Sequence, residues 1–215
     1  EIVISITGTD DGAIITGGDT GEVTEDLDVQ PVDQLVYTDQ LEGDDVDFDQ
    51  DQVDPSQTVA VGSNTLGNLD IQADGNWTYT VANALTQYLA VGQTKLELFQ
   101  ITTVGGTEHI VAVTINGTND VPTLEAVVAN GDVDAVTLPE TNQPLASAGT
   151  LTAGDVDVRD SVTPSVTSLS TAGNTDALDN AALLSMFSVD AVAVIANGAT
   201  EGTVNWSFDS ADESF

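Results

Sequence analysis

Two short polar stretches, "TGTDDG" (7–12) and "NGTNDVP" (116–122), each follow a run of alternating apolar residues. Each stretch places two adjacent side chains with oxygen atoms where a predicted strand ends. The pairs are Asp10 with Asp11 and Asn119 with Asp120. Such oxygens suit a hard cation, whereas Asn and Asp also form turns by hydrogen bonding to their own backbone. The motif alone leaves both interpretations open.

The charge of the chain favours the cation. Acidic residues number 36 against two basic ones, so the formal net charge is −34. Such a chain repels nucleic acid and anionic lipid, and we expect neither as a partner. High charge with few aromatic residues is also typical of disorder, but the regular alternation of apolar residues argues against it. The oxygen-rich side chains favour calcium as counterion over magnesium, zinc or copper.

Absent residue types and patterns narrow the possibilities further. The sequence has no cysteine, so it contains neither disulfides nor thiolate metal sites. No signal peptide and no apolar run of membrane length are visible, so we expect no insertion into a membrane.

An internal repeat organises the chain. Three pairs of segments match in the same order. They are 4–12 with 113–121, 41–49 with 151–160, and 76–80 with 205–209. The first two pairs are 109 and 110 residues apart, and the third pair follows roughly twenty extra residues in the second copy. We therefore predict residues 1–11 as the last strand of a preceding repeat, 12–120 as one full repeat, and 121–215 as a second repeat that is truncated before its last strands.

Strands dominate each predicted repeat. Apolar side chains recur with a period of two, as in Trp77, Tyr79 and Val81, and clusters of Gly, Asn and Asp separate the runs. Helical patterns are weak, with one or two turns expected in 83–92 and 178–187. Short strands without helices between them predict an all-β fold of tandem Ig-like β-sandwich domains.

Residues 74–122 resemble the VCBS repeat of very large bacterial surface proteins. That repeat has a Gly-x-Trp-x-Tyr strand, a Leu-Ala-x-Gly turn, and a final strand that runs into Gly-Thr-Asn-Asp-x-Pro. The matching residues are Gly75, Trp77 and Tyr79, then Leu89, Ala90 and Gly92, then Gly117 to Pro122. The resemblance extends over most of the chain.

The resemblance implies a setting and a role. VCBS-type repeats occur in tandem in secreted RTX adhesins, which Gram-negative bacteria export by type I secretion. The resemblance therefore implies an extracellular, cadherin-like module on the bacterial cell surface. It would act as an extender in cell adhesion and biofilm formation, with neighbouring repeats of the same polypeptide as partners. A host or abiotic surface would be bound only by other regions of the parent protein.

The cadherin-like character also implies a calcium site at the repeat junction. Ca²⁺ takes six to eight oxygens, so several segments must converge. The implied ligands are Asn119 and Asp120 from the linker, Asp155 and Asp157 from the following repeat, and Glu25 from the preceding one. Asp10, Asp11, Asp45 and Asp47 would form the equivalent set at the other end of the first repeat, and Glu140 would face a following repeat. The chain lacks the full Asp-x-Asn-Asp-Asn linker of cadherins, which leaves the number of ions open.

In the acidic run 43–54, acids fall at positions 1, 3, 5 and 7 of an EF-hand loop counted from Asp45. However, Gln50 occupies the loop position that needs glycine, and Ser56 occupies the position that needs a bidentate glutamate. We instead expect alternating acids on one strand face, with Asp45 and Asp47 contributing to calcium.

Catalysis finds little support, and we expect no enzyme. His109 is the only histidine, and its parity in the strand predicts a half-buried structural role. Trp77 and Trp206 fall at inward positions and are expected in the core. Carboxylates are too common for any chosen pair to indicate glycoside hydrolysis.

Two further hypotheses stay open. One is an adhesin module that binds a sugar or peptide through the inserted region 160–204. The other is strand exchange, in which residues 1–7 complete the second repeat of a neighbouring molecule and so form head-to-tail chains.

Overall fold

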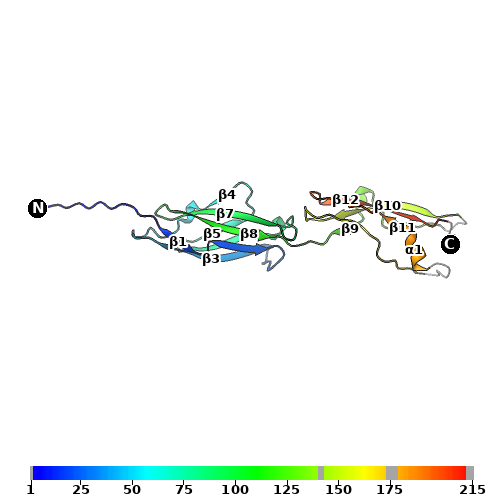
Figure 1. Ribbon diagram of the computed structural model, residues 1–215, viewed down its shortest axis with the longest axis horizontal. Coiled ribbons are helices and arrows are strands. Elements are labelled where there is room, and N and C mark those ends of the chain that lie inside the picture. Colours follow the sequence, from blue (N-terminus) through cyan, green and yellow to red (C-terminus); the bar gives the residue numbers. More distant parts are fainter. Residues whose placement is uncertain (1, 140–142, 173–178, 212–215) are drawn as a thin grey trace. The chain divides into compact units, whose positions relative to one another are not determined.

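The computed structural model describes residues 2–139, 143–172 and 179–211. Its strands fall into two compact units, Glu1–Thr118 and Asn119–Phe215 (Figure 1). The strands of the first unit are β1 Ile14–Gly17, β2 Thr20–Thr24, β3 Gln34–Asp44, β4 Val59–Val61, β5 Asn68–Ile71, β6 Asn76–Ala82, β7 Thr94–Thr102 and β8 Glu108–Asn116. Those of the second unit are β9 Thr123–Glu125, β10 Ala146–Gly154, β11 Phe187–Val189 and β12 Glu201–Asp209. Short helices are the 3-10 turns Pro55–Gln57, Asn83–Leu85 and Val128–Asn130, and α1 Asn180–Ser185.

The first unit is a β-sandwich of two four-stranded sheets. One sheet has the order β1-β3-β6-β5 and the other the order β2-β8-β7-β4, with β2 parallel to β8. Alternate side chains of β6 and β8 point into the space between the sheets, which is why Trp77, Tyr79 and Val113 are at most 2% exposed. The edge of the Tyr79 ring meets Phe99 of β7, with ring centroids 5.9 Å apart. The predicted sandwich is confirmed here.

The second unit repeats one of these sheets. Its described strands form a single sheet in the order β11-β12-β10-β9. β10 and β12 pair antiparallel over nine residues each, and β3 and β6 of the first unit pair antiparallel over seven. The buried cluster is correspondingly small, with Ala153, Ile195 and Val204 at its centre. The all-β prediction therefore holds in both units.

Three local predictions have different outcomes. The helical prediction near 178–187 is confirmed by α1, and 83–92 contains the 3-10 turn Asn83–Leu85. The prediction of acids alternating along a strand in 43–54 is wrong, because β3 ends at Asp44. The Asp45 side chain accepts a hydrogen bond from the backbone of Asp47, and such local bonds compete with strand pairing.

Residues 2–13, before β1, form neither helix nor strand. The proposal that this segment is the last strand of a preceding repeat stays a prediction, since a strand needs a partner strand for its backbone hydrogen bonds. Among the helices described here, none is long and apolar enough to cross a bilayer.

Candidate functional site

The candidate site begins where β8 of the first unit ends. Glu25 follows β2 directly and is fully buried. Its carboxylate accepts a hydrogen bond from the backbone of Thr118 at 3.0 Å, and its own backbone N–H donates to Asn116 at 2.9 Å. The predicted ligand Glu25 thus lies against the chain that leaves β8.

A glycine next to this point explains part of the repeated motif. The backbone N–H of Gly117 donates to the carbonyl of Gln93 at 2.9 Å. A Cβ atom added at Gly117 would lie 2.0 Å from the carbonyl oxygen of Leu89, so no larger residue fits without a shift. The Leu-Ala-x-Gly turn and the Gly-Thr-Asn-Asp stretch therefore pack against each other through their backbones.

The second unit gathers three of the predicted ligands, and we refer to Asp120, Asp155 and Asp157 as the second-unit corner. The backbone N–H of Asp120 donates to Asp157 Oδ2 at 2.8 Å, and that of Asp157 donates to Asp155 Oδ1 at 3.0 Å. Asp155 is 5% exposed and Asp157 is 0% exposed. Burial raises the pKa of Asp157 above its usual value; Asp160 and Asp155 add to the rise, while the bond from Asp120 opposes it.

The first unit contains the same arrangement, which we call the first-unit corner: Asp11, Asp45 and Asp47. The backbone N–H of Asp11 donates to Asp47 Oδ2 at 2.8 Å, and that of Asp47 donates to Asp45 Oδ1 at 2.9 Å. Each donor and acceptor is the repeat equivalent of one in the second-unit corner. This corner is less buried, because Asp45 and Asp47 are only partly shielded from solvent.

The chemistry of the two corners fits a hard cation. Asp157 Oδ1 and Asp45 Oδ2 are both buried, and neither has a hydrogen-bond partner among the described residues. A buried anionic oxygen without a donor is costly, and this chain has only two basic residues to compensate for it. Ca²⁺ binds carboxylate and carbonyl oxygens without demanding a fixed geometry. Within the described ranges, however, no group of three or more His, Asp and Glu side chains is arranged to hold a metal ion.

Three further predicted ligands belong to neither corner. The Asn119 side-chain amide donates to the carbonyl of Asp120 at 2.7 Å, a local contact of the kind expected in a turn. Asp10 is exposed in the segment before β1. Glu140 lies outside the described residues. Calcium binding by any of these residues stays a prediction.

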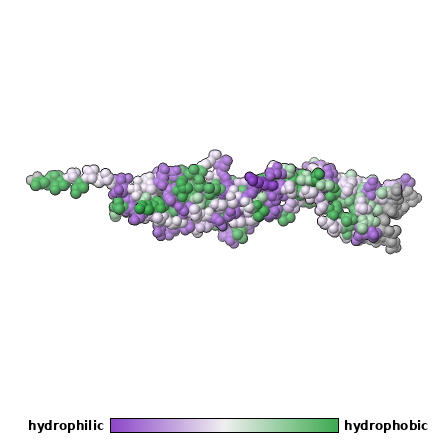
Figure 2. Space-filling model, in the orientation of Figure 1, coloured by the Kyte–Doolittle hydropathy of each residue, from purple (hydrophilic) through white to green (hydrophobic). Residues whose placement is uncertain are grey.

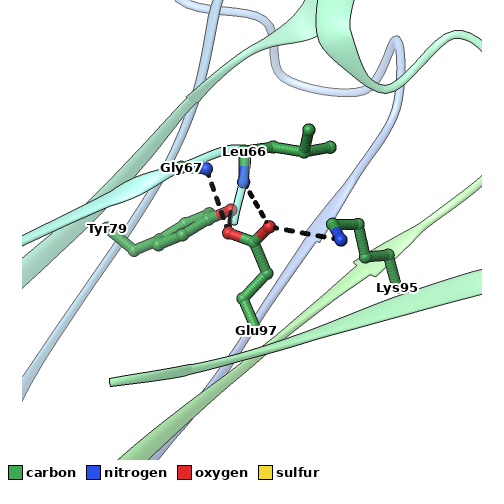
Figure 3. A network of polar contacts seen from close by, with 5 residues as sticks. All are labelled: Leu66, Gly67, Tyr79, Lys95 and Glu97. Atoms are coloured by element: carbon green, nitrogen blue, oxygen red, sulfur yellow. Dashed lines mark hydrogen bonds and ion pairs between the residues drawn. The ribbon is translucent and has the colours of Figure 1, made fainter. Parts of the chain in front are cut away.

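A second polar cluster was not found by sequence reasoning. Glu97 of β7 is 2% exposed, and its carboxylate accepts bonds from the backbone of Leu66 at 2.6 Å, from that of Gly67 at 3.0 Å and from the Tyr79 hydroxyl at 2.8 Å. Lys95 Nζ lies 3.8 Å from the same carboxylate (Figure 3). Burial, followed by Glu97, raises the pKa of Tyr79 far above its usual value. Both carboxylate oxygens have donors, so the cluster fixes the loop before β5 against β6 and β7.

The histidine and the two tryptophans occupy structural positions. His109 is partly buried, and its Nε2 lies 3.2 Å from Asp19 Oδ2. Trp77 and Trp206 are 2% and 9% exposed, as predicted for core residues. Their indole N–H groups donate to the carbonyls of Gly18 and Val133, each at 2.8 Å.

Comparison with known proteins gives distant structural likenesses. No protein-family model matches this sequence, and no curated protein matches it. The cadherin chain described as "PcdhgB3 EC1-4 in 50 mM HEPES" aligns with a TM-score of 0.40 and 12% identity over 96% of this chain. This chain spans only 42% of the length of that one.

Two bacterial structures are also similar. A protein of unknown function from Porphyromonas gingivalis aligns with a TM-score of 0.31 and 12% identity, over 93% of this chain and 84% of that one. The sialic acid binding region of a Streptococcus sanguinis adhesin aligns with a TM-score of 0.34 and 10% identity, over 94% of this chain and 69% of that one. The assignment of the fold therefore depends on the sheets themselves.

Proposed function

We propose that this chain is a pair of calcium-stiffened spacer repeats from a secreted bacterial adhesin, with a mechanical and not a catalytic role. The observation that carries the proposal is the acidic corner that recurs in both units. In each unit, a backbone N–H of the segment that enters the unit is bound by an Asp-x-Asp pair with a buried oxygen that lacks a donor. A cation would complete the arrangement.

The residues that would hold calcium are the carboxylates of the two corners, together with the predicted ligands Glu25, Asn119, Asp10 and Glu140. The ion would supply the positive charge that the chain lacks. The role of the protein would be to hold the entering segment by the Asp120 and Asp11 N–H groups and to keep water away from Asp155 and Asp157. Without the ion, neighbouring carboxylates repel one another, and the entering segments are free to flex.

The proposed setting follows from the resemblance of 74–122 to VCBS repeats and from the composition. An extracellular position on a bacterial surface would supply millimolar calcium, so a dissociation constant on the order of 10⁻⁴–10⁻³ M would suffice. Neighbouring repeats of the same polypeptide would be the partners, and other regions of the parent protein would bind the host or abiotic surface. Cell adhesion and biofilm formation would be the biological outcome.

Thermal melting of Asp157→Asn, with calcium and with chelator, tests the proposal. Asparagine keeps an oxygen that can accept the bond from Asp120 but removes the buried charge. We therefore expect the variant to melt higher than the wild type in chelator. We also expect it to lose most of the rise in melting temperature that millimolar calcium gives the wild type. The two curves should cross as calcium is added.

Asp70→Asn is the matched control, because Asp70 is exposed on β5 and the substitution removes the same charge. The control should keep the full calcium response. Equal concentrations of magnesium should shift the wild type much less. An unchanged wild-type melting temperature with calcium and with chelator would overturn the calcium mechanism.

The stiffening itself needs a separate measurement. Small-angle X-ray scattering of the wild type should give a narrower distribution of interatomic distances in calcium than in chelator, since a locked linker samples fewer arrangements. Calcium binding without any change in this distribution would support a stabilising ion but contradict the spacer role.

The alternative of a ligand site in 160–204 gains little support from its described residues. Phe187 of this region stacks on Trp206 with ring centroids 5.8 Å apart, so each of these rings already packs against the other. The groove beside it is lined by Asp134, Ser147 and seven apolar side chains. A sugar needs several polar partners, and this lining favours an apolar occupant.

A further inference from the structure

One lysine, Lys95 of β7, lies beside a small pocket of the first unit. The pocket has a volume of about 270 Å³ and is lined by Val61, the loop 62–65 and residues 95–97. The Lys95 side chain is 21% exposed, so molecules in the solvent can reach it. The first unit has no other lysine or arginine, and the chain carries a net charge of −34. The pocket therefore has a positive charge that the rest of this unit lacks.

Glu97 does not account for this lysine. Its carboxylate already accepts hydrogen bonds from the backbone of Leu66 and Gly67 and from the Tyr79 hydroxyl, at 2.6, 3.0 and 2.8 Å. Lys95 Nζ lies 3.8 Å from Glu97 Oε1, which is too long for a hydrogen bond (Figure 3). Within the described residues, the three N–H groups of the ammonium have no hydrogen-bond acceptor. They are available to a ligand in the pocket.

The loop 62–65, between β4 and β5, supplies more polar groups. Gly62 begins it with a φ of 122°, which favours glycine and turns the chain out of β4. Ser63, Asn64 and Thr65 line the pocket, and none of their side chains or backbone N–H groups donates a hydrogen bond to another described residue. The two hydroxyls and the amide can each donate and accept. The pocket therefore combines one ammonium group with several uncharged polar groups.

The same pocket has an apolar wall. Val61 and Leu96 line it and are 45% and 60% exposed. Figure 2 shows a hydrophobic area on the first unit that lies over β7 in the view of Figure 1. Sites for small organic ligands combine such apolar contacts with a few polar groups that fix the orientation of the ligand. An inorganic anion would use the lysine but would leave the apolar wall uncovered.

We propose that this pocket binds one acidic sugar unit, a pyranose ring that carries a carboxylate. The carboxylate accepts charge-assisted hydrogen bonds from Lys95, the residues 63–65 pair with the ring hydroxyls, and Val61 and Leu96 contact the C–H face of the ring. A volume of about 270 Å³ lies just below the range of pockets for drug-sized ligands, which suits a single ring. The net charge of the chain repels the ligand at long range, so we expect a dissociation constant on the order of 1 mM. This binding is additional to the proposed spacer role and does not depend on calcium.

Titration of the isotope-labelled chain with glucuronate, followed by nuclear magnetic resonance, tests the proposal. The buffer contains no calcium, so that no ion can bridge the ligand to the acidic side chains. We expect shifts confined to the amides of the loop 62–65 and of residues 95–97. Glucose lacks the carboxylate and acetate lacks the ring, so each should bind more weakly than glucuronate by about tenfold or more. Acetate that binds as well as glucuronate, or no shifts in these residues with glucuronate far above 1 mM, would overturn the proposal.

Lys95→Met tests the role of the charge, because methionine keeps an unbranched apolar side chain and loses the ammonium. It should weaken glucuronate binding by about tenfold or more, whereas Lys95→Arg should keep most of the affinity. Arg159→Met is the matched control, because it removes the other positive charge of the chain from an exposed position in the second unit. Equal losses in Lys95→Met and Arg159→Met would mean that only the net charge matters and would contradict a site at Lys95.

The loop can be tested without changing any contact of Glu97. Asn64→Asp replaces an amide that donates hydrogen bonds with a carboxylate that repels the ligand, and it should abolish glucuronate binding. Asn68→Asp is the control, because Asn68 is also exposed but does not line the pocket, and it should leave binding nearly unchanged. Both asparagines are exposed, so both variants should melt as the wild type does. Binding that survives Asn64→Asp would place the ligand elsewhere and overturn the proposed site.

Discussion

Glu97 in the first unit and Asp157 in the second are both buried carboxylates, but their surroundings differ. Glu97 accepts two backbone N–H groups and a tyrosine hydroxyl, and a lysine ammonium lies 3.8 Å away. Asp157 accepts one backbone N–H on Oδ2, while its Oδ1 is buried without a donor among the described residues. Protein groups satisfy the first carboxylate, whereas the second leaves room for a cation. Burial of a carboxylate alone therefore does not indicate a metal site.

The units differ in the same way at a larger scale. The first unit closes its aromatic face with a second sheet, and the second unit leaves an apolar groove on the equivalent face. Each of the following predictions tests one part of this contrast.

The largest effect is expected from removing the equivalent tryptophans. Trp77→Ala should lower the free energy of unfolding of the first unit by about 3–5 kcal/mol, because Trp77 is enclosed by both sheets. Trp206→Ala should cost the second unit only about 2 kcal/mol, since Trp206 borders the open groove. Urea denaturation at low protein concentration, followed by circular dichroism, measures both. Equal costs would mean that the two faces are equally covered.

Removing Glu97 should have the next largest effect. Glu97→Ala leaves the N–H groups of Leu66 and Gly67 and the Tyr79 hydroxyl without their acceptor, which should cost about 2–4 kcal/mol. Calcium should change this cost little, because the carboxylate is already satisfied. Glu42→Ala, at an exposed position on β3, is the control and should be nearly neutral. A calcium-dependent loss at Glu97 would contradict its structural role.

The acidic corners were predictable because their hydrogen bonds are local or recur with the repeat. Asp-x-Asp places one carboxylate two residues before the N–H that it accepts, as Asp155 does for Asp157. The resemblance to cadherin-like repeats implied Asp120, Asp155 and Asp157 as one set, and aligning the two copies added Asp11, Asp45 and Asp47 as their equivalents. The period-two parity of the strands predicted the inward positions of Trp77 and Trp206.

The Glu97 cluster was harder to predict because it depends on contacts between distant segments. In "KLELFQI" (95–101), Leu96 points outward and is 60% exposed, while Glu97 shares the inward parity of Phe99 and Ile101. That parity indicated an inward position for Glu97. However, a charged residue at an inward position ordinarily suggests that the inward and outward faces of the strand have been assigned the wrong way round. The partners of Glu97 lie 18 and about 30 residues away, in β6 and in the loop before β5.

The two corners should respond differently to loss of charge in the absence of calcium. Asp157→Asn should stabilise the second unit by on the order of 1 kcal/mol in chelator, because it removes a buried charge that the protein does not compensate. Asp47→Asn should have a smaller effect on the first unit, because Asp47 is only partly buried. Chemical denaturation of each variant in chelator measures the difference. A larger gain at Asp47 would reverse the order of burial inferred for the two corners.

The smallest effect is a contrast in pH dependence between two carboxylates of the second unit. The pKa of Asp157 is raised by burial, so the folded unit takes up this proton before the unfolded chain does. In chelator, Asp157 therefore contributes stability as the pH falls through its raised pKa toward 3.8, and Asp157→Asn should lose that gain.

The pKa of Asp132 is instead lowered, first by the hydroxyl of Thr152 and then by that of Thr150, which donate at 2.6 and 2.7 Å. Its contribution is present above pH 3.8 and is lost as the pH falls through the lowered pKa, so Thr152→Val should weaken the unit at neutral pH and less so in acid. Urea denaturation between pH 7 and pH 3, taken as the difference between each variant and the wild type, cancels the titration of the other acids. Differences of the same sign for both variants would mean that the charge of Asp157 is stabilised by the protein, as that of Asp132 is, and the case for a cation at the second-unit corner would fail with it.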